Sequence, residues 1–143
     1  VLDRDAFFIG RGIDYWTALE ASLKLKEIAY IHTEAYSSGE LKHGPIALIT
    51  KGTPVIAIIT QEGTNRVTRS NLTETASRGA RTYVIASKSL AIPEDDVIIP
   101  NVAHYLSGII SAMVCQLIAY YAAVYRGNDV DKPKNLAKSV TVE

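Results

Sequence analysis

Side chains that can move protons lie close together in residues 20–43. Glu20, Lys24 and Glu27 are spaced by four and three residues, and His43 follows a polar, turn-rich segment. At about 100° per residue, the first three fall on one narrow stripe of a helix. Carboxylates beside a lysine and a histidine can perform acid–base chemistry. The same spacing also occurs in ordinary ion pairs on solvated helix faces, so spacing alone leaves both interpretations open.

The helix that must position this stripe is predicted over residues 14–31. This segment contains no Gly or Pro, and Asp14 is a candidate N-cap. An apolar stripe of Ala21, Leu25 and Ile28 is expected to face the core. The connection 33–45 follows, with one short helix expected near residues 39–42.

Strands and helices alternate along the rest of the chain. The turn Gly10-Arg11-Gly12 does not complete a dinucleotide-binding fingerprint, and it is predicted to lead from a buried strand into the first helix. Alternation of this kind implies an α/β fold in which both faces of a parallel sheet are covered. Strands are predicted at 6–9, 54–59, 81–86 and 97–99, and further helices at 65–78 and 105–126. The run 54–59 is entirely apolar and is expected to be central.

Composition excludes several classes of function. The chain has 143 residues and no formal net charge, which argues against nucleic acid or an anionic membrane as a partner. Its single cysteine, Cys115, cannot form an internal disulfide and is expected to be a buried, inert thiol in a reducing cytoplasm. Residues 105–125 carry no formal charge and are long enough to span a bilayer. Their polar residues favour a helix buried in a core or a subunit interface instead. The chain begins with Val almost directly before a strand, so it is expected to be part of a longer protein.

The loop 60–65 is a candidate phosphate site, because hydroxyls at a helix start can bind phosphate. It contains Thr60 and Thr64, but the charge of Glu62 opposes an anion. We therefore expect another region to hold most of any phosphate, and an ordinary surface loop is the alternative.

Two long stretches carry a resemblance to a known family. Residues 19–49, LEASLKLKEIAYIHTEAYSSGELKHGPIALI, resemble the sugar isomerase (SIS) half of the glucosamine-6-phosphate synthases, or isomerising glutamine–fructose-6-phosphate aminotransferases. Residues 129–143, DVDKPKNLAKSVTVE, resemble their C-terminus. The resemblance implies a doubly wound three-layer α/β/α sandwich. Residues 1–126 would be the second SIS domain and residues 127–143 a tail, with the glutaminase and first SIS domains absent.

The resemblance implies roles for three residues around a sugar phosphate. Glu27, made more basic by partial burial, would carry a proton between the two top carbons of the sugar. His43 would assist ring opening in the site of a neighbouring subunit, so a homodimer is implied. Lys138 would add to a ketose carbonyl and form an imine with loss of water. We expect Glu27 to lie near the His43 loop at the carboxyl edge of the sheet, beside a cleft.

Supporting residues follow from the same comparison. Glu20 and Lys24 would set the charge around Glu27, and Asn135 and Ala137 match the family in the tail. Lys134 stands where the family usually has Arg. A lysine keeps the positive charge but lacks the bidentate fork of a guanidinium.

The implied function is part of the module that converts fructose-6-phosphate and glutamine-derived ammonia to glucosamine-6-phosphate in the cytoplasm. No cofactor or metal is implied, and the isolated chain is expected to be almost inactive. The alternatives are an SIS isomerase or deglycase of other specificity and a non-catalytic domain that binds sugar phosphates or mediates dimerisation.

Overall fold

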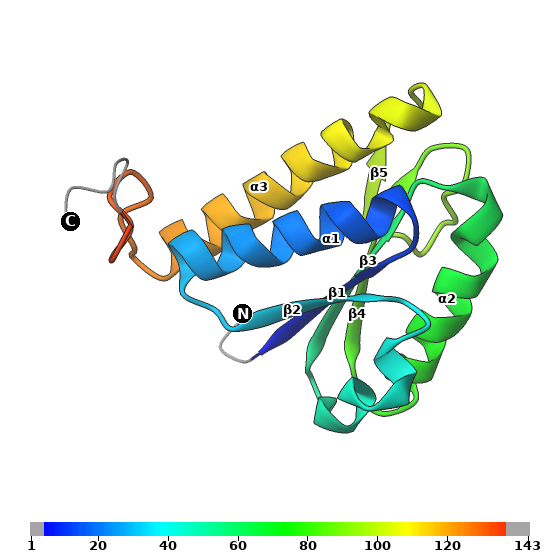
Figure 1. Ribbon diagram of the computed structural model, residues 1–143, viewed down its shortest axis with the longest axis horizontal. Helices are drawn as coiled ribbons and strands as arrows, with labels where there is room; N and C mark the ends of the chain where they lie inside the picture. Colours follow the sequence, from blue (N-terminus) through cyan, green and yellow to red (C-terminus); the bar gives the residue numbers. More distant parts are fainter. Residues whose placement is uncertain (1–4, 137–143) are drawn as a thin grey trace, which may run out of the picture.

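The computed structural model describes residues 5–136 and has three layers, as Figure 1 shows. A sheet of five parallel strands runs in the order β2-β1-β3-β4-β5. The strands are β1 Ala6–Gly10, β2 Thr33–Ser37, β3 Pro54–Ile59, β4 Arg81–Ser87 and β5 Val97–Ile99. The helices are α1 Ile13–Lys24, α2 Glu62–Ala76 and α3 Ser107–Tyr125, with a π-helical turn at Leu25–Ala29 and 3-10 turns at Leu41–His43, Pro45–Leu48 and His104–Leu106. The predicted three-layer α/β/α architecture is confirmed.

The central strands are the ones that the sequence indicates most clearly. All six residues of β3 are buried, and this strand pairs with both β1 and β4. A strand covered on both faces must be apolar throughout, which is why the run 54–59 has no alternation of polar residues.

β2 is a strand where we expected an irregular connection. Its sequence, TEAYS, is polar, and only its first residue, Thr33, is fully buried. It forms the edge of the sheet and pairs with β1 alone, with Thr33 opposite Ala6 and Ser37 opposite Gly10. An edge strand has a neighbouring strand on one side only and can be less buried, so its residues need not be apolar throughout. Composition therefore does not indicate β2 as it indicates β3.

Two hydrophobic cores lie on opposite faces of the sheet. The first lies between the sheet and the helices α1 and α3, and it includes Leu25, Ala29 and Cys115. The second includes Leu41 and Leu72, so α2 and the 3-10 turn Leu41–His43 cover the other face. Burial raises the pKa of the Cys115 thiol to about 12, which agrees with the inert thiol that was predicted.

Small residues allow α1 and α3 to pack closely. The buried residues of α3 recur every fourth position and are all small: Ser107, Ser111, Cys115, Ala119 and Ala123. A Cβ atom added at Gly108 would lie 3.1 Å from Ile13 Cγ2, so there is little room between the two helices. This contact fixes the direction of α1 across the sheet.

Buried hydrogen bonds attach α1 to β2. Ser22 Oγ donates to the Thr33 carbonyl at 2.9 Å, and Thr33 Oγ1 donates to the Ser22 carbonyl at 2.8 Å. The reciprocal pair satisfies polar groups that would otherwise be costly to bury. It also holds the end of the helix next to the start of the edge strand.

Asp14 is not the N-cap that we expected. The helix is preceded by Gly12, whose positive φ of 58° favours glycine, and the Asp14 side chain points into the protein. Its carboxylate accepts hydrogen bonds from the Thr60 N–H at 2.8 Å and from the Thr60 hydroxyl. Asp14 therefore joins the start of α1 to the end of β3, where the strand order changes direction.

Candidate active site

Lys24 lies between two carboxylates at the end of α1. Its Nζ is 2.6 Å from Glu27 Oε2 and 3.4 Å from Glu20 Oε1. The side chains of Lys24 and Glu27 are each 28% exposed. The hydrogen bond to Glu27 raises the pKa of Lys24, burial opposes this change, and the charge of Glu20 adds to it. The three side chains predicted to share one stripe are thus brought together, with the lysine charged.

Glu27 lies in a π-helical turn, so the prediction of one regular helix over residues 14–31 is wrong. The α-helix ends at Lys24, and Leu25–Ala29 form a wider turn. The turn closes when the Tyr30 N–H donates to the Leu25 carbonyl, with Tyr30 in the left-handed conformation at φ 55°. Single π-helical turns occur frequently at functional sites. The residues LKEIA are ordinary helix formers, so composition gives no signal for the change.

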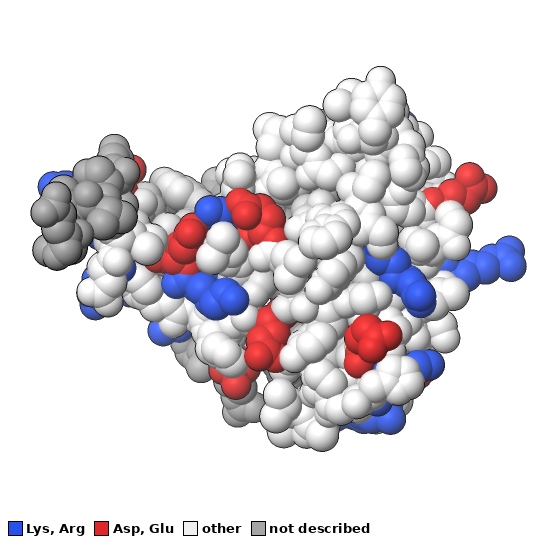
Figure 2. Space-filling view, in the orientation of Figure 1, with Lys and Arg blue, Asp and Glu red and all other residues white. Residues whose placement is uncertain are grey.

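A groove runs beside this cluster of charges. It has a volume of about 550 Å³ and lies between α1, α3 and the start of the tail. Its walls are formed by Glu20, Lys24, Ile28, Met113, Gln116, Leu117, Ala119, Tyr120, Val130 and Asp131. Figure 2 shows charged side chains gathered over this end of α1, next to an uncharged surface over α3. A polar small molecule could therefore meet charged groups on one side of the groove and apolar groups on the other.

The position of Glu27 relative to the sheet differs from our expectation. A helix between two parallel strands must return the chain from the carboxyl edge of the sheet to its amino edge. α1 does so, because Thr33 follows it closely and pairs with Ala6, the first residue of β1. Glu27 therefore lies toward the amino edge, and the prediction that it lies at the carboxyl edge is wrong, although a groove is present beside its partners.

His43 is not near Glu27 within this chain. It follows β2, whose last residue lies opposite Gly10 at the carboxyl edge. The neighbouring Leu41 is buried in the core on the α2 side, whereas Leu25 and Ala29 of the π-helical turn are buried in the core on the α1 side. The sheet separates the two segments, so the expected proximity is wrong for a single chain.

The tail turns back onto the π-helical turn. Asn128 Nδ2 donates to the Ile28 carbonyl at 3.0 Å, and the Lys134 N–H donates to the Tyr30 hydroxyl at 2.7 Å. Asn135 is exposed and has a positive φ of 61°. The predicted site residues Ala137 and Lys138 lie outside the described residues.

The carboxyl edge of the sheet carries a second polar hollow of about 340 Å³. The hydrogen-bonded residues that underlie this hollow were not predicted from the sequence. Thr60 Oγ1 and Gln61 Nε2 both lie within hydrogen-bond distance of Ser107 Oγ, and Asp14 lies beneath them. Burial raises the pKa of Asp14, although hydrogen bonds from Thr60 and Gln61 and the charge of His104 oppose the change. Glu62 lines the hollow, so its carboxylate would repel a phosphate there.

Among residues 5–136, no group of three or more His, Cys, Asp or Glu side chains is arranged to hold a metal ion.

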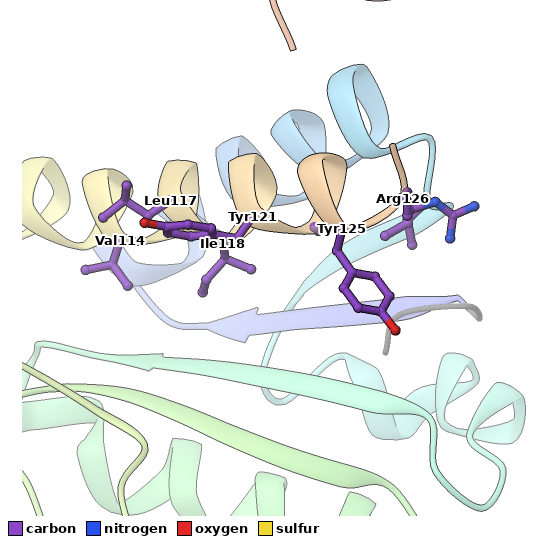
Figure 3. Close-up of a pocket in the computed structure, with 8 residues that line it drawn as sticks. Val114, Leu117, Ile118, Tyr121, Tyr125 and Arg126 are labelled. Atoms are coloured by element: carbon purple, nitrogen blue, oxygen red, sulfur yellow. The ribbon is translucent and has the colours of Figure 1, made fainter. Parts of the chain in front are cut away.

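α3 is less buried than we predicted. Among the described residues, one helix, His104–Tyr125, is long enough and apolar enough to cross a membrane, judged by length and composition alone. Only 28% of its most apolar stretch is buried. Figure 3 shows the side of α3 that faces the sheet, where Val114, Ile118 and Tyr125 extend over an open trough of about 520 Å³. The small-residue stripe of α3 is buried in the core, and Ile110, Val114, Ile118 and Ala122 pack against that core while partly exposed. The alternative, that α3 is buried in a subunit interface, stays a prediction.

The chain resembles known proteins over almost its whole length. The family model described as "SIS domain" matches residues 3–126. A glutamine–fructose-6-phosphate aminotransferase (isomerising) from Listeria innocua is 59% identical over 140 residues, which is 98% of this chain and 23% of the relative. The chain therefore spans about a quarter of the length of that relative.

Solved structures agree with this comparison. The C-terminal domain of glucosamine–fructose-6-phosphate aminotransferase from Francisella tularensis is 37% identical with a TM-score of 0.82, over 91% of this chain and 38% of that one. Glucosamine-6-phosphate deaminase from Thermotoga maritima is 29% identical with a TM-score of 0.78, over 95% of this chain and 40% of that one. With the family model covering most of its residues, the chain belongs to the SIS domain family.

Proposed function

We propose that residues 1–126 are the second SIS domain, and residues 127–143 the C-terminal tail, of an isomerising glutamine–fructose-6-phosphate aminotransferase. The complete enzyme would convert fructose-6-phosphate and glutamine-derived ammonia to glucosamine-6-phosphate in the cytoplasm. The observation that carries this proposal is the Glu27 carboxylate, held by Lys24 in a π-helical turn next to a groove. Similarity to aminotransferases along almost the whole chain supports the choice of reaction.

Glu27 would transfer the proton between the top two carbons of the sugar. Ammonia would first replace the C2 oxygen as an imine nitrogen, with that oxygen leaving as water. The Glu27 carboxylate would then take a proton from C1, so that the C–H electron pair forms a C1–C2 double bond and the C2–N π pair moves to nitrogen, which takes up a proton from the C1 hydroxyl. The protonated Glu27 would return its proton to C2 as the C1 oxygen becomes the aldehyde carbonyl. The Lys24 ammonium lies 2.6 Å from the Glu27 carboxylate and would hold it in position for this transfer. Glu20 would offset the charge of Lys24.

The substrate would be held mainly by the first SIS domain of the complete enzyme. Glu27 lies away from the carboxyl edge of its own sheet, which is the edge where open α/β sheets bind ligands. The outer surfaces of α1 and α3 expose many large apolar side chains, among them Trp16 at 68%, Ile109 at 59% and Met113 at 55%. Exposed apolar surface of this extent is typical of protein interfaces. A first SIS domain packed there would bring its carboxyl edge, and a bound sugar phosphate, to the groove.

His43 and Lys138 would complete the site from other segments. His43 lies across the sheet from Glu27 within one chain, so it would act in the site of a partner subunit in a homodimer. Lys138 would add its amine to the ketose carbonyl and release one water to form an imine. Because the first SIS domain and the ammonia source would lie outside this chain, we expect the chain alone to turn over little fructose-6-phosphate. Robust isomerisation by the isolated chain would contradict that expectation.

The Glu27→Gln variant of the full-length enzyme tests the proposal. Glutamine keeps the shape of the side chain but cannot accept the proton, so turnover should fall by about 100-fold or more while affinity for fructose-6-phosphate is retained. Glu74→Gln on α2 is the matched control, because Glu74 lies on the other face of the sheet. Unchanged turnover of Glu27→Gln would remove Glu27 from the mechanism and favour a non-catalytic domain that binds sugar phosphates.

A second candidate is an SIS enzyme of other specificity. The deaminase from Thermotoga maritima, at 29% identity, supports this alternative. Assays of the full-length enzyme with glutamine present or absent separate the two. Net amino-sugar formation that needs glutamine supports the aminotransferase, and ammonia release from an amino-sugar phosphate as the only reaction supports a deaminase.

A further inference from the structure

The described part of the C-terminal tail is attached to the candidate active site at three points. Asn128 Nδ2 donates to the Ile28 carbonyl at 3.0 Å, and the Lys134 N–H donates to the Tyr30 hydroxyl at 2.7 Å. Between these two attachments, Val130 packs against the core that lies between the sheet and the helices α1 and α3. The tail between the attachments is therefore held against the π-helical turn and the end of α1.

Asp131 is placed on the wall of the groove by these attachments. Its N–H donates to Asp129 Oδ1 at 2.9 Å, and the Lys132 N–H donates to the same oxygen at 3.2 Å, so the backbone turns tightly here. Asp131 lines the groove together with Glu20 and Lys24. The tail thus adds a carboxylate to a space whose other charges come from α1.

The charges on the groove walls leave no cation to receive a bound anion. Among the described residues that line the groove, Lys24 is the one cationic side chain. Its Nζ lies 2.6 Å from Glu27 Oε2 and 3.4 Å from Glu20 Oε1, so two carboxylates already share its charge. No salt bridge within residues 5–136 neutralises Asp131. Three carboxylates therefore stand against one ammonium around this space.

Repulsion from these carboxylates reaches all of the groove. A compact space of about 550 Å³ is about 10 Å across, which is close to the Debye length at about 0.1 M salt. A phosphate group carries about −1.5 to −2 charges at pH 7, so it would be repelled wherever it lay in the groove. Hydroxyl and carbonyl groups carry no charge and can hydrogen-bond to the same walls. The groove therefore suits the uncharged end of a sugar.

We propose that Asp131 is a specificity-determining residue that keeps sugars with an anionic group at C1 out of the groove. In the proposed reaction Glu27 acts on C1 and C2, so a substituent on C1 would extend toward the groove walls. The phosphate at C6 would point away from them, toward the first SIS domain. This inference rests on the proposed function, because it needs the top of the sugar to lie here. The substrate class is then a ketose monophosphate with a free C1 hydroxyl.

Competition between sugar phosphates in the full-length enzyme tests the inference. Fructose-1,6-bisphosphate, with a second phosphate at C1, and glucitol-6-phosphate, with an uncharged hydroxyl there, would be measured as inhibitors of fructose-6-phosphate conversion. Asp131→Asn removes the charge and keeps the shape of the side chain. At about 0.01 M salt, the inhibition constant of the bisphosphate should fall by roughly fivefold relative to that of glucitol-6-phosphate. This change should shrink as the salt concentration rises to about 1 M, because salt screens the repulsion.

Two further variants show whether the charge at this position is responsible. Asp131→Glu keeps the charge and should keep the wild-type ratio of the two inhibition constants. Glu74→Gln is the matched control, because it removes one carboxylate on α2, on the other face of the sheet. An unchanged ratio in Asp131→Asn would overturn the inference, as would an equal change in Glu74→Gln or a change that salt does not reduce. A bisphosphate that inhibits neither the wild type nor Asp131→Asn would overturn it as well.

Glu27→Gln separates failure of this inference from failure of the proposed function. If Glu27→Gln is inactive while Asp131→Asn keeps the wild-type ratio of inhibition constants, only the role of Asp131 is wrong. If Glu27→Gln turns over normally, the proposed function itself is wrong.

Discussion

The Lys24 ammonium lies 2.6 Å from the Glu27 carboxylate, across the boundary between an α-helix and a π-helical turn. The two residues are three apart, so an ordinary helix would also bring them close. The π-helical turn changes the direction of the chain after Lys24. The C-terminal tail binds to that turn. Ion pairs of this kind are common on protein surfaces, but this one lies between a groove and the C-terminal tail.

Removal of the Lys24 charge should weaken catalysis in the full-length enzyme. Lys24→Met keeps most of the side-chain volume but leaves Glu27 without the ammonium that hydrogen-bonds its carboxylate. We expect kcat to fall by roughly tenfold, the effect of losing one charged hydrogen bond that positions the proposed base. Lys26→Met is the control, because Lys26 is an exposed lysine in the same turn. Equal effects of the two variants would show that general charge, and not the pair with Glu27, is responsible.

The pair of Arg69 and Asp95 should make stability depend on pH. The two terminal guanidinium nitrogens of Arg69 each lie 2.7 Å from an Asp95 carboxylate oxygen, and the Asp95 side chain is 1% exposed. Burial raises the pKa of Asp95, but hydrogen bonds from Arg69 and the Ile92 N–H outweigh it and hold that pKa below its ordinary value of 3.8. This contribution to stability is therefore present above about pH 4 and is lost as the pH falls through the lower, folded-state value.

Asp95→Asn tests this dependence by urea unfolding at several pH values. At pH 7 the variant should be less stable by about 2 kcal/mol, because Arg69 loses its charged partner. The difference from the wild type should shrink as the pH falls below about 4. A difference that stays constant over this range would contradict the assignment to Asp95.

Packing between α1 and α3 should tolerate little added volume. Ala119 is fully buried in the small-residue stripe of α3. Ala119→Leu should therefore cost about 1–3 kcal/mol in the free energy of unfolding, through overpacking. Ala112→Leu, at a half-buried position of the same helix, should cost less. Similar melting temperatures for the two variants would argue against the close approach of these helices.

The parts of the fold that the sequence predicted are those governed by local composition. The apolar run 54–59 could only be a buried strand, and the structure has β3 with those bounds. The same holds for the Glu20, Lys24 and Glu27 stripe, since helical spacing alone brings these side chains together. β2 was missed because an edge strand gains its stability from hydrogen bonds to β1 rather than from apolar side chains.

Relationships set by topology were predicted poorly. We expected Glu27 and His43 to be neighbours because they are close in sequence. Instead, α1 returns the chain to the amino edge of the sheet and β2 carries it back to the carboxyl edge, so Glu27 and His43 lie on opposite faces. Asp14 was expected to cap α1 because aspartate often does, whereas its bond to Thr60, 46 residues away, depends on how β3 lies beside β1.

Cleavage of the C1–hydrogen bond of fructose-6-phosphate tests the central claim most directly. The full-length enzyme and its Glu27→Gln variant would be given substrate deuterated at C1, and label lost from C1 during turnover would be followed by mass spectrometry, wherever the label is transferred. If Glu27 is the base, the variant should cleave this bond at least about 100-fold more slowly than the wild type while still binding the sugar phosphate. Cleavage by Glu27→Gln at the wild-type rate would contradict the account.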